Sequence, residues 1–337
     1  MKKVVVDAFG GDNAPAAIIA GCAQALSEIP DLFLIVTGDE ERIRQEFTKH
    51  PGTDLSRVEI RHAPDVITNS EHPVNAVRKK KDSSMVKALE AVANHEADVF
   101  VSAGSTGAVL AGATFIVRRI KGVKRPALAP VLPTSKDHDV LLIDCGANVD
   151  TKPLNLQQFA IMGSAYSERI LGMKNPRVGL LNNGAEAEKG CELTKEAYQL
   201  LQETPVNFTG NCEGRDILSG DFDVVVADGF AGNVALKSIE GTASMIMGIL
   251  KRELMGGILS RIGALFAKSA FKRVKSKMDY SKHGGALLLG IDGGIIKAHG
   301  TCDANAFAVT LHQAAAFIDG DVVNIIRQSI ESMPMPE

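Results

Sequence analysis

The chain has 337 residues, enough to bury a substantial hydrophobic core in one large domain or two ordinary ones. Hydrophobic residues make up 45% of it and charged residues 23%, which is typical of a soluble globular protein and argues against a disordered or membrane-embedded chain. The net charge of −3, the lack of Trp and an aromatic content of 5% offer neither a general attraction for nucleic acid nor a base-stacking surface. We therefore expect no nucleic-acid partner.

The N-terminal sequence "MKKVVVDAFGGD" has only three consecutive apolar residues, too few for the core of a signal peptide. No stretch approaches the ~18 apolar residues of a membrane span. The five cysteines form no CxxC pair, so neither disulfides nor a structural zinc site is indicated. These features predict a cytoplasmic protein.

Short β-branched segments alternate along the chain with longer segments of helical periodicity. This alternation predicts an α/β fold, a doubly wound α/β/α sandwich with a mostly parallel sheet. We expect one continuous domain over residues 1–337, with a helical excursion at about 240–282. The expected strands are Lys3–Val6, Leu32–Val36, Val58–Ile60, Val99–Ser102, Val140–Ile143, Val178–Leu181, Phe208–Gly210, Val224–Ala227 and Gly294–Ala298. The expected helices are Ala14–Leu26, Ser84–His95, Gly107–Val117, Leu156–Leu171, Gly190–Gln202, Asn233–Leu250 and Cys302–Ile318.

Five of the expected strands end in loops rich in Gly, Asn, Asp and Ser. The carboxyl ends of parallel strands lie at one edge of a sheet, where ligands bind, so we expect the five loops to meet at a common rim. Ordinary turn chemistry is the alternative for any single loop. The five sequences are "VVVDAFGGDNAP" (4–15), "VFVSAGSTGAVLAG" (99–112), "VLLIDCGANVD" (140–150), "VGLLNNGAEAEKG" (178–190) and "VVVADGFAGN" (224–233).

Glycines beside Asn, Ser and Thr at helix starts offer backbone N–H groups and neutral donors, which suit an anion or an oxyanion. The sequence "RKKKDSSM" (78–85) adds four basic residues before Asp82 and Ser83, either of which could cap the following helix. Positive charge beside a helix N-terminus favours a phosphate site. A solvated surface run is the alternative interpretation.

Several other chemistries lack their motifs. GxxxxGK[ST], GxGxxG, GxSxG and HExxH are all missing, so we expect neither a cofactor nor a metal. Cys145, Cys191 and Cys302 lie in polar loops but are expected to fill tight turns rather than act as nucleophiles. His299 follows a strand and either donates to an anion or fixes a turn.

Eight motifs follow one another along the chain: "DAFGGDNAP", "RKKKDSSM", "SAGSTGA", "CGANVDTKP", "PRVGLLNNGAEAEKG", "NFTGNCEGRD", "VADGFAGN" and "IKAHGTCDANA". In this order they resemble the phosphate acyltransferase family of bacterial phospholipid synthesis, from Val4 to about Ile318. The resemblance implies an α/β/α sandwich related to phosphotransacetylases and isocitrate-type dehydrogenases, working as a homodimer without cofactor. It implies transfer of a long-chain fatty acyl group from acyl carrier protein to inorganic phosphate. A membrane glycerol-phosphate acyltransferase would use the product.

Five positions depart from the family pattern. Phe9 stands in place of Met and Ser105 in place of Asn, and other residues of the family are replaced by Cys145, Cys191 and Cys302, which argues further against thiol catalysis. Phosphotransacetylases that use short-chain acyl-CoA are the nearest alternative, because they need the same phosphate site. A metal- and NAD-dependent dehydrogenase of similar fold and a non-enzymatic lipid-binding protein are more distant alternatives.

Site residues follow from these loops and from the resemblance. A thioester exchange needs phosphate held near the carbonyl and donors for the tetrahedral oxyanion. We expect Asp228 to orient Asn233 or to accept a proton from phosphate. The expected phosphate ligands are Lys80, Lys81, Ser83, Gly104, Ser105, Thr106 and Gly107. The expected oxyanion and thioester residues are Asn182, Asn183, Lys189, Asn233 and His299, and Asp7, Gly10, Gly11, Asp12, Asn148, Gly184, Gly229 and Phe230 are expected to contact substrate.

Residues 251–282 contain nine basic and two acidic residues, a net charge of +7 that leaves −10 for the remainder. Apolar residues at i, i+4 spacing from Leu250 to Phe266 predict an amphipathic helix. Its apolar side would pack in the core or a dimer, or lie on an anionic membrane, and its basic side also suits the acidic carrier protein. The expected docking residues are Lys251, Arg252, Arg261, Lys268, Lys272 and Arg273.

Overall fold

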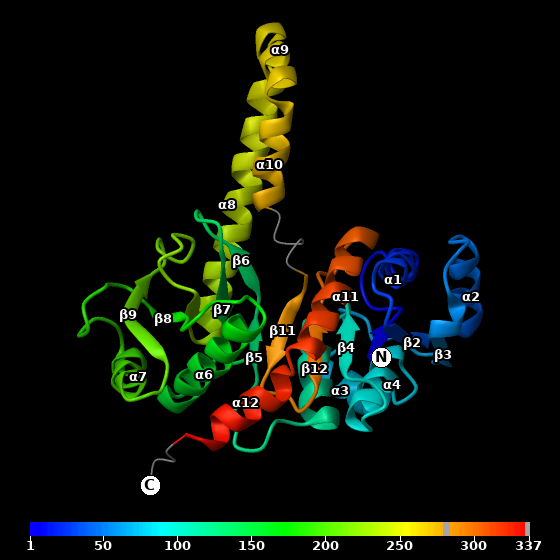
Figure 1. Ribbon diagram of the computed structural model, residues 1–337, viewed down its shortest axis with the longest axis horizontal. Coiled ribbons are helices and arrows are strands. Elements are labelled where there is room, and N and C mark those ends of the chain that lie inside the picture. The colour runs from blue at the N-terminus through cyan, green and yellow to red at the C-terminus, as the bar shows by residue number, and fades with distance from the viewer. Residues whose placement is uncertain (279–283, 334–337) are drawn as a thin grey trace.

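The computed structural model describes residues 1–278 and 284–333. Its middle layer consists of two β-sheets, in which the described strands follow the orders β3-β2-β1-β4-β12-β11-β5 and β6-β7-β10-β8-β9 (Figure 1). Most neighbouring strands are parallel, as predicted. The strands are β1 (Lys2–Asp7), β2 (Leu32–Gly38), β3 (Val58–His62), β4 (Val99–Ser102), β5 (Ala127–Ala129), β6 (Val131–Pro133), β7 (Asp139–Ile143), β8 (Arg177–Asn182), β9 (Asn207–Glu213), β10 (Val224–Val226), β11 (Ala286–Leu289) and β12 (Gly294–Lys297).

The segment 127–133 joins the two sheets. Its first part, β5, pairs antiparallel with β11, and its second part, β6, pairs antiparallel with β7. Only Pro130 separates these parts, and its carbonyl oxygen accepts a hydrogen bond from Leu142 N at 3.1 Å. The sheets therefore continue into each other through one shared segment.

This junction reverses the direction of the second sheet. β12 runs parallel to β4, and two antiparallel steps, from β12 to β11 and from β11 to β5, restore the same direction in segment 127–133. β7 runs against that segment, and β10 and β8 are parallel to β7. The carboxyl ends of β7, β10 and β8 therefore lie at the opposite edge from those of β1, β4 and β12. The prediction that five loops meet at one rim is wrong for this reason.

Helices cover both faces of the combined sheet, which confirms the predicted α/β sandwich. Buried residues of α1, α2, α6, α7, α11 and α12 pack on one face, and those of α3, α4, α5 and the start of α8 on the other. The helices are α1 (Ala16–Glu28), α2 (Glu40–Thr48), α3 (Pro73–Lys79), α4 (Ser84–Ala93), α5 (Thr106–Gly112) with its π-helical continuation (Ala113–Val117), α6 (Pro153–Arg169), α7 (Glu192–Gln202), α8 (Gly229–Met255), α9 (Ile258–Phe266), α10 (Lys268–Met278), α11 (Ala304–Asp319) and α12 (Val322–Glu331), with a 3-10 turn at Leu55–Arg57.

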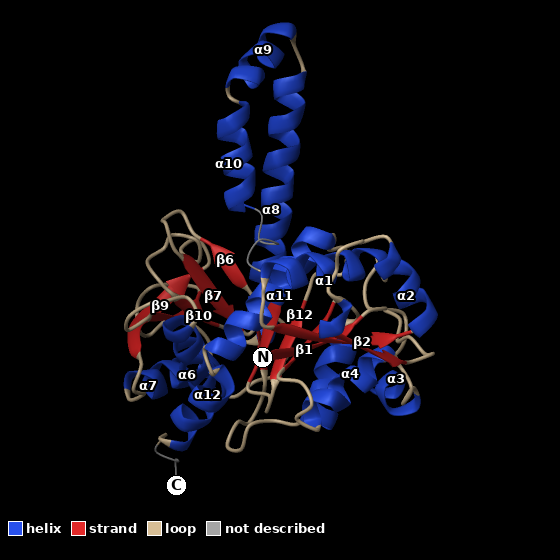
Figure 2. Ribbon diagram, turned by 45° about the vertical axis from the view of Figure 1, so that its right-hand side comes forward, coloured by secondary structure: helices blue, strands red, loops and turns tan. Residues whose placement is uncertain are grey.

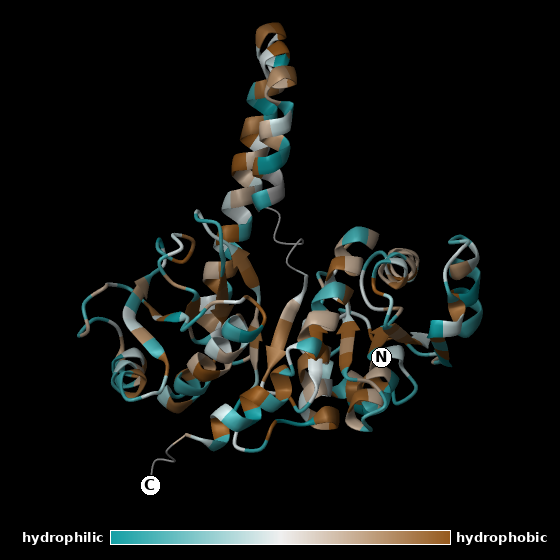
Figure 3. Cartoon of the chain, viewed as in Figure 1, coloured by the Kyte–Doolittle hydropathy of each residue, from teal (hydrophilic) through white to brown (hydrophobic). Residues whose placement is uncertain are grey.

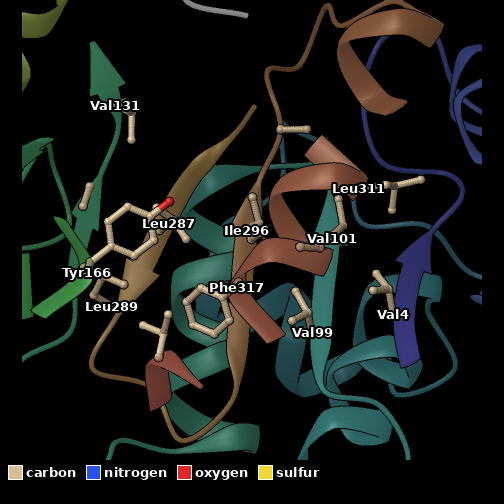
Figure 4. Packing of buried hydrophobic residues seen from close by; sticks show 14 of the residues in the cluster. Val4, Val99, Val101, Val131, Tyr166, Leu287, Leu289, Ile296, Leu311 and Phe317 are labelled. Carbon is tan, nitrogen blue, oxygen red and sulfur yellow. The ribbon is translucent and has the colours of Figure 1, made fainter. Parts of the chain in front are cut away.

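One hydrophobic core cluster spans both sheets. Figure 4 shows Tyr166 of α6 beside Leu287 and Leu289 of β11, where the two sheets meet. Burial of this tyrosine raises its pKa to about 12. A core shared in this way is what one domain over residues 1–337 requires, and the division of the chain into domains stays a prediction.

The second half of α8, with α9 and α10, forms a helical hairpin that projects from the sandwich (Figures 1 and 2). It corresponds to the predicted excursion, of which residues 279–282 lie outside the described part of the chain. Figure 3 shows apolar and polar residues interspersed along it. The predicted unbroken amphipathic helix is wrong, because α8 ends at Met255 and α9 begins at Ile258 after two glycines. No helix in the described residues is both long and apolar enough to span a membrane.

Candidate functional site

Three strand ends form the first edge of the site. β1, β4 and β12 are adjacent and parallel, and their register places Asp7, Ser102 and Lys297 side by side. Ser102 Oγ donates to Asp7 Oδ2 at 2.7 Å and accepts from Gly104 N at 2.9 Å. Asp7 is 1% exposed, and this burial raises its pKa. Asp7 therefore lies beneath the loop 102–107 and holds it in place.

Backbone contacts connect the loops that follow these strands. Asp12 N donates to the carbonyl oxygen of Gly300 at 2.8 Å, and Asn13 Nδ2 donates to the carbonyl of Thr301 at 3.1 Å. A side chain at Gly10 would lie 2.6 Å from Ser102 Oγ, so only glycine permits this close approach. The loops after β1, β4 and β12 thus converge; the sequence predicts this for the first two, and the loop after β12 is an addition.

A cavity of about 210 Å³ opens beside these loops, between the two sheets. Thr106, Lys297 and His299 line it on one side, and Lys237 and Glu240 of α8 line it on the other. Lys237 Nζ forms an ion pair with Glu240 Oε2 at 2.7 Å. The cavity therefore combines fixed positive charge with the start of α5.

Lys297 is the main residue that the sequence analysis missed. It is 9% exposed, and its Nζ donates to the carbonyl oxygens of Ala103, at 3.2 Å, and Ala298. Burial lowers its pKa to about 8, so the ammonium form prevails at neutral pH. No carboxylate in the described residues forms an ion pair with it. A lysine directly after the apolar run "GII" and before "AHG" is the sequence signal that could have identified it.

His299 lies two residues beyond Lys297, and its contacts fix a turn, one of the two roles that the sequence predicts for it. Its Nδ1 accepts a hydrogen bond from Thr301 N at 3.3 Å and lies 2.9 Å from Thr301 Oγ1. An accepting Nδ1 favours the tautomer with its proton on Nε2. The turn therefore orients the imidazole beside the cavity.

The lysine-rich segment before α4 lies outside this cavity. Lys80 Nζ donates to Glu71 Oε1 at 2.9 Å and to the carbonyl oxygen of Val66 at 2.7 Å, and the Glu71 pKa is lowered to about 2 by the Thr68 N–H and by Lys80. Ser83 is buried and caps α4 by accepting from Val86 N at 3.3 Å. The cap is as predicted, whereas Lys80 and Ser83 do not line the cavity and Lys81 is exposed.

The loops after β7 and β10 meet each other at the opposite edge. Asn148 Nδ2 donates to Asp144 Oδ2 at 2.9 Å and to the carbonyl oxygen of Pro126 at 2.7 Å, so its amide is part of a buried network. Gly229 N donates to the carbonyl oxygen of Asn148 at 2.8 Å. Asp228 Oδ1 caps α8 by accepting from the backbone N–H groups of its second and third residues, at 3.0 and 2.9 Å. These groups fix the start of α8.

Asn233 and Phe230 project from the first turns of α8. A side chain at Gly146 would lie 2.8 Å from Asn233 Nδ2, so the amide packs against the loop after β7. Asn233 also lies one helical turn before Lys237, which lines the cavity. Phe230 is 64% exposed. The Asn233 amide therefore faces the loop after β7, and neither Asn233 nor Phe230 lines the cavity.

The loop after β8 is held by its own contacts. Asn182 Nδ2 donates to the carbonyl oxygen of Lys189 at 3.2 Å and to Asn211 Oδ1 at 3.1 Å. Asn183 N donates to Asn182 Oδ1 at 2.9 Å, and its side chain is exposed. Gly184 is buried beside Lys189. None of these residues lines the cavity, because the reversed sheet places them at the far edge.

The three cysteines of the polar loops are not placed to act as nucleophiles in the cavity. Burial raises the pKa of Cys145 and of Cys302, which disfavours the nucleophilic thiolate. Cys191 is exposed, and a hydrogen bond from the Thr194 backbone lowers its pKa, but it lies in the loop after β8 and does not line the cavity. Among the described residues, no group of three or more His, Cys, Asp or Glu side chains could hold a metal ion.

Comparison with known proteins places this architecture in a family. Residues 2–325 match the family described as "Fatty acid synthesis protein". The chain is 50% identical over 329 residues to a phosphate acyltransferase of Clostridium novyi (strain NT) and 47% identical to that of Bacillus licheniformis, covering 98% of each chain in both comparisons. A phosphotransacetylase structure from Streptococcus pyogenes matches with a TM-score of 0.60 at 17% identity, over 98% of this chain and 94% of that one, a likeness of fold alone. The chain therefore belongs to the phosphate acyltransferases of the fatty acid synthesis protein family, which are acyltransferase enzymes.

Proposed function

We propose that the enzyme transfers a long-chain fatty acyl group from acyl carrier protein to inorganic phosphate. The observation that carries this proposal is the buried ammonium of Lys297, without an ion pair among the described residues, beside the loop 102–107. A lysine has three N–H donors, and two are used by carbonyl oxygens. The third can serve an anion in the cavity. Because the chain belongs to the phosphate acyltransferases, we take phosphate as the acceptor.

In the proposed reaction, a phosphate oxygen attacks the thioester carbonyl carbon. The carbon–oxygen bond forms, the carbon–sulfur bond breaks, and the electron pair leaves with sulfur. A thiol has a pKa of ~8.5, so its thiolate departs with little help from an acid. The principal need is orientation, which can supply up to roughly 7–11 kcal/mol. Lys297 with Gly104, Ser105, Thr106 and Gly107 would hold phosphate.

Donors for the tetrahedral oxyanion complete the site. We assign this role to His299, which lines the cavity. One preorganised oxyanion donor contributes about 3–4 kcal/mol to the transition state. Asp228 caps α8 and so fixes the start of the helix that carries Lys237 into the cavity wall.

Labelled phosphate tests the reaction directly. Incubation with palmitoyl acyl carrier protein should give labelled acyl phosphate, which hydroxylamine converts to a hydroxamate. A parallel reaction with acetyl-CoA tests the phosphotransacetylase alternative. Product from acetyl-CoA and none from the acyl carrier protein would contradict the proposal.

The hairpin is the proposed docking surface. All six predicted docking residues are exposed, and the tip also exposes Ile258, Leu259, Leu265 and Phe266, 71–87% each. The basic residues suit the acidic carrier protein or an anionic membrane, and the apolar residues suit a second copy in a homodimer or lipid. We place the enzyme in the cytoplasm, in peripheral contact with the membrane where a glycerol-phosphate acyltransferase takes up the product.

Charge reversal on the hairpin tests which of these partners binds to its basic residues. Lys268→Glu with Lys272→Glu should weaken binding to acyl carrier protein or to anionic vesicles, while the KM for phosphate stays unchanged. Lys195→Glu on α7 is the control, because Lys195 is equally exposed but distant from the hairpin. Sedimentation of wild type gives the oligomeric state. Unaltered binding to both partners would remove the docking proposal.

A further inference from the structure

A second cavity adjoins the one that contains Lys297. It has a volume of about 380 Å³ and lies between the loop that follows β6, helix α8 and helix α10. Leu132 and Glu240 line both cavities, so the two share a wall. The remaining lining is largely apolar and includes Leu218, Ile239, Ala243 and Val274. We call this second cavity the apolar chamber.

The two adjoining cavities differ in chemistry. Thr106, Lys297 and His299 provide donors and positive charge at one end, and aliphatic side chains form the other. The Lys237–Glu240 ion pair lies between them. A volume of this size is within the range of about 300–1,000 Å³ for small-molecule sites. The ligand that matches both ends is an amphiphile with a polar carbonyl head and a hydrocarbon tail.

We propose that the apolar chamber holds the hydrocarbon chain of the acyl substrate while its thioester lies beside Lys297. The assignment of the head group rests on the proposed function, and the chamber adds where the tail binds and which residues select its length. Each methylene transferred from water to an apolar wall strengthens binding by a factor of about 4. Short chains end before the chamber and do not gain this contribution.

The hairpin closes one side of the chamber. Lys277 Nζ of α10 donates to the carbonyl oxygen of Lys136 at 2.8 Å and lies 3.4 Å from Asp137 Oδ1. These contacts hold α10 against the loop that follows β6, which brings Val274 over Leu132 and Ile239. The element that carries the exposed apolar tip therefore also forms a wall of the chamber.

Filling the chamber tests the proposal. Ala243→Phe adds a ring to a chamber wall, and Ser244→Phe adds the same ring at an exposed neighbour that lines neither cavity. Activity is measured with hexadecanoyl and butanoyl acyl carrier protein. Displacing two methylenes predicts that Ala243→Phe lowers the ratio of hexadecanoyl to butanoyl activity about 15-fold. Ser244→Phe should leave this ratio unchanged.

Binding gives a second measurement that is independent of turnover. cis-Parinaric acid, a fluorescent long-chain fatty acid, should bind wild type and Ser244→Phe saturably and bind Ala243→Phe at least 10-fold more weakly. Leu218→Trp approaches the chamber from another element and replaces Ala243→Phe if that variant does not fold.

The outcomes separate the two proposals. Wild type that makes no acyl phosphate from either substrate contradicts the proposed function. Active enzyme with an unchanged chain-length ratio and unchanged parinaric acid binding in the chamber variants overturns the chamber. Equal loss with both chain lengths also overturns it, because a damaged reaction site has no chain-length preference.

Discussion

Replacement of Lys297 by methionine removes a buried charge with little change in side-chain volume. The unfolded lysine has a pKa of 10.5 and the folded one about 8. Burial of the charged ammonium therefore destabilises the folded state by its full amount at every pH below about 8. This destabilisation disappears as the pH rises from about 8 to 10.5. A difference of this size corresponds to about 3 kcal/mol at neutral pH. Lys297→Met would recover that free energy.

The loss of two hydrogen bonds opposes this gain in stability. The carbonyl oxygens of Ala103 and Ala298 lose their lysine donor, at a cost of about 1–3 kcal/mol each when buried. The net change in the free energy of unfolding should therefore be small, within about 3 kcal/mol of zero. Phosphate binding has no such compensation. Loss of one charged hydrogen bond, about 1.5–3 kcal/mol, should raise the KM for phosphate about 10- to 150-fold.

The assay is the dependence of initial rate on phosphate concentration at a saturating acyl donor, with urea unfolding measured on the same samples. Lys80→Met is the matched control, because Lys80 is already paired with Glu71 outside the cavity. It should change the KM for phosphate less than threefold. If Lys80→Met raises this KM and Lys297→Met does not, the phosphate lies beside α4 and our reasoning about the buried lysine is wrong.

Three further outcomes are expected. The KM for phosphate should rise as the pH increases through about 8, because Lys297 loses its charge there, and a pH series in Lys297→Met should lack this step. Gly232→Ala should unfold the start of α8, because its methyl group would overlap the carbonyl oxygen of Asp144. Gly241 has open space around it, so Gly241→Ala should raise the free energy of unfolding by up to about 1 kcal/mol. Thermal melts compare the two variants. Asn183→Ala should leave turnover within twofold of wild type and the free energy of unfolding within about 0.5 kcal/mol, because its side chain is exposed at the far edge. A large loss of turnover in folded protein would show instead that this loop is part of the active site.

Local pattern predicted much of the fold. The apolar runs of β1, β4, β7, β8 and β10 and the cap at Ser83 are properties of adjacent residues, so composition and periodicity reveal them. The direction of a strand relative to its neighbours is not a local property. β5, β6 and β11 are only three or four residues long, and these short antiparallel strands turn the second sheet around.

The candidate site shows the same division. The glycine-rich loops at 10–11 and 104–107 could be recognised from the sequence, and the structure brings them together. Asn182 also lies at a strand end rich in glycine and amides, but its side-chain amide donates to Lys189 of the same loop and to Asn211 of β9. Lys297 is a single cation in an apolar strand, and its burial and lowered pKa arise from packing that the sequence does not display. The glycine pair before α9 was visible, yet the regular apolar spacing across it suggested an unbroken helix.

The segment 127–133 serves as a neighbour to two strands at once. A truncated form that starts after this segment still contains β11 and β7 but leaves the backbone of each without this partner. Such a fragment would present unsatisfied rows of N–H and C=O groups to other molecules, a template for intermolecular strand pairing. Shorter versions of this enzyme for crystallisation or for split reporters should therefore keep this stretch intact and cut in the surface loops instead.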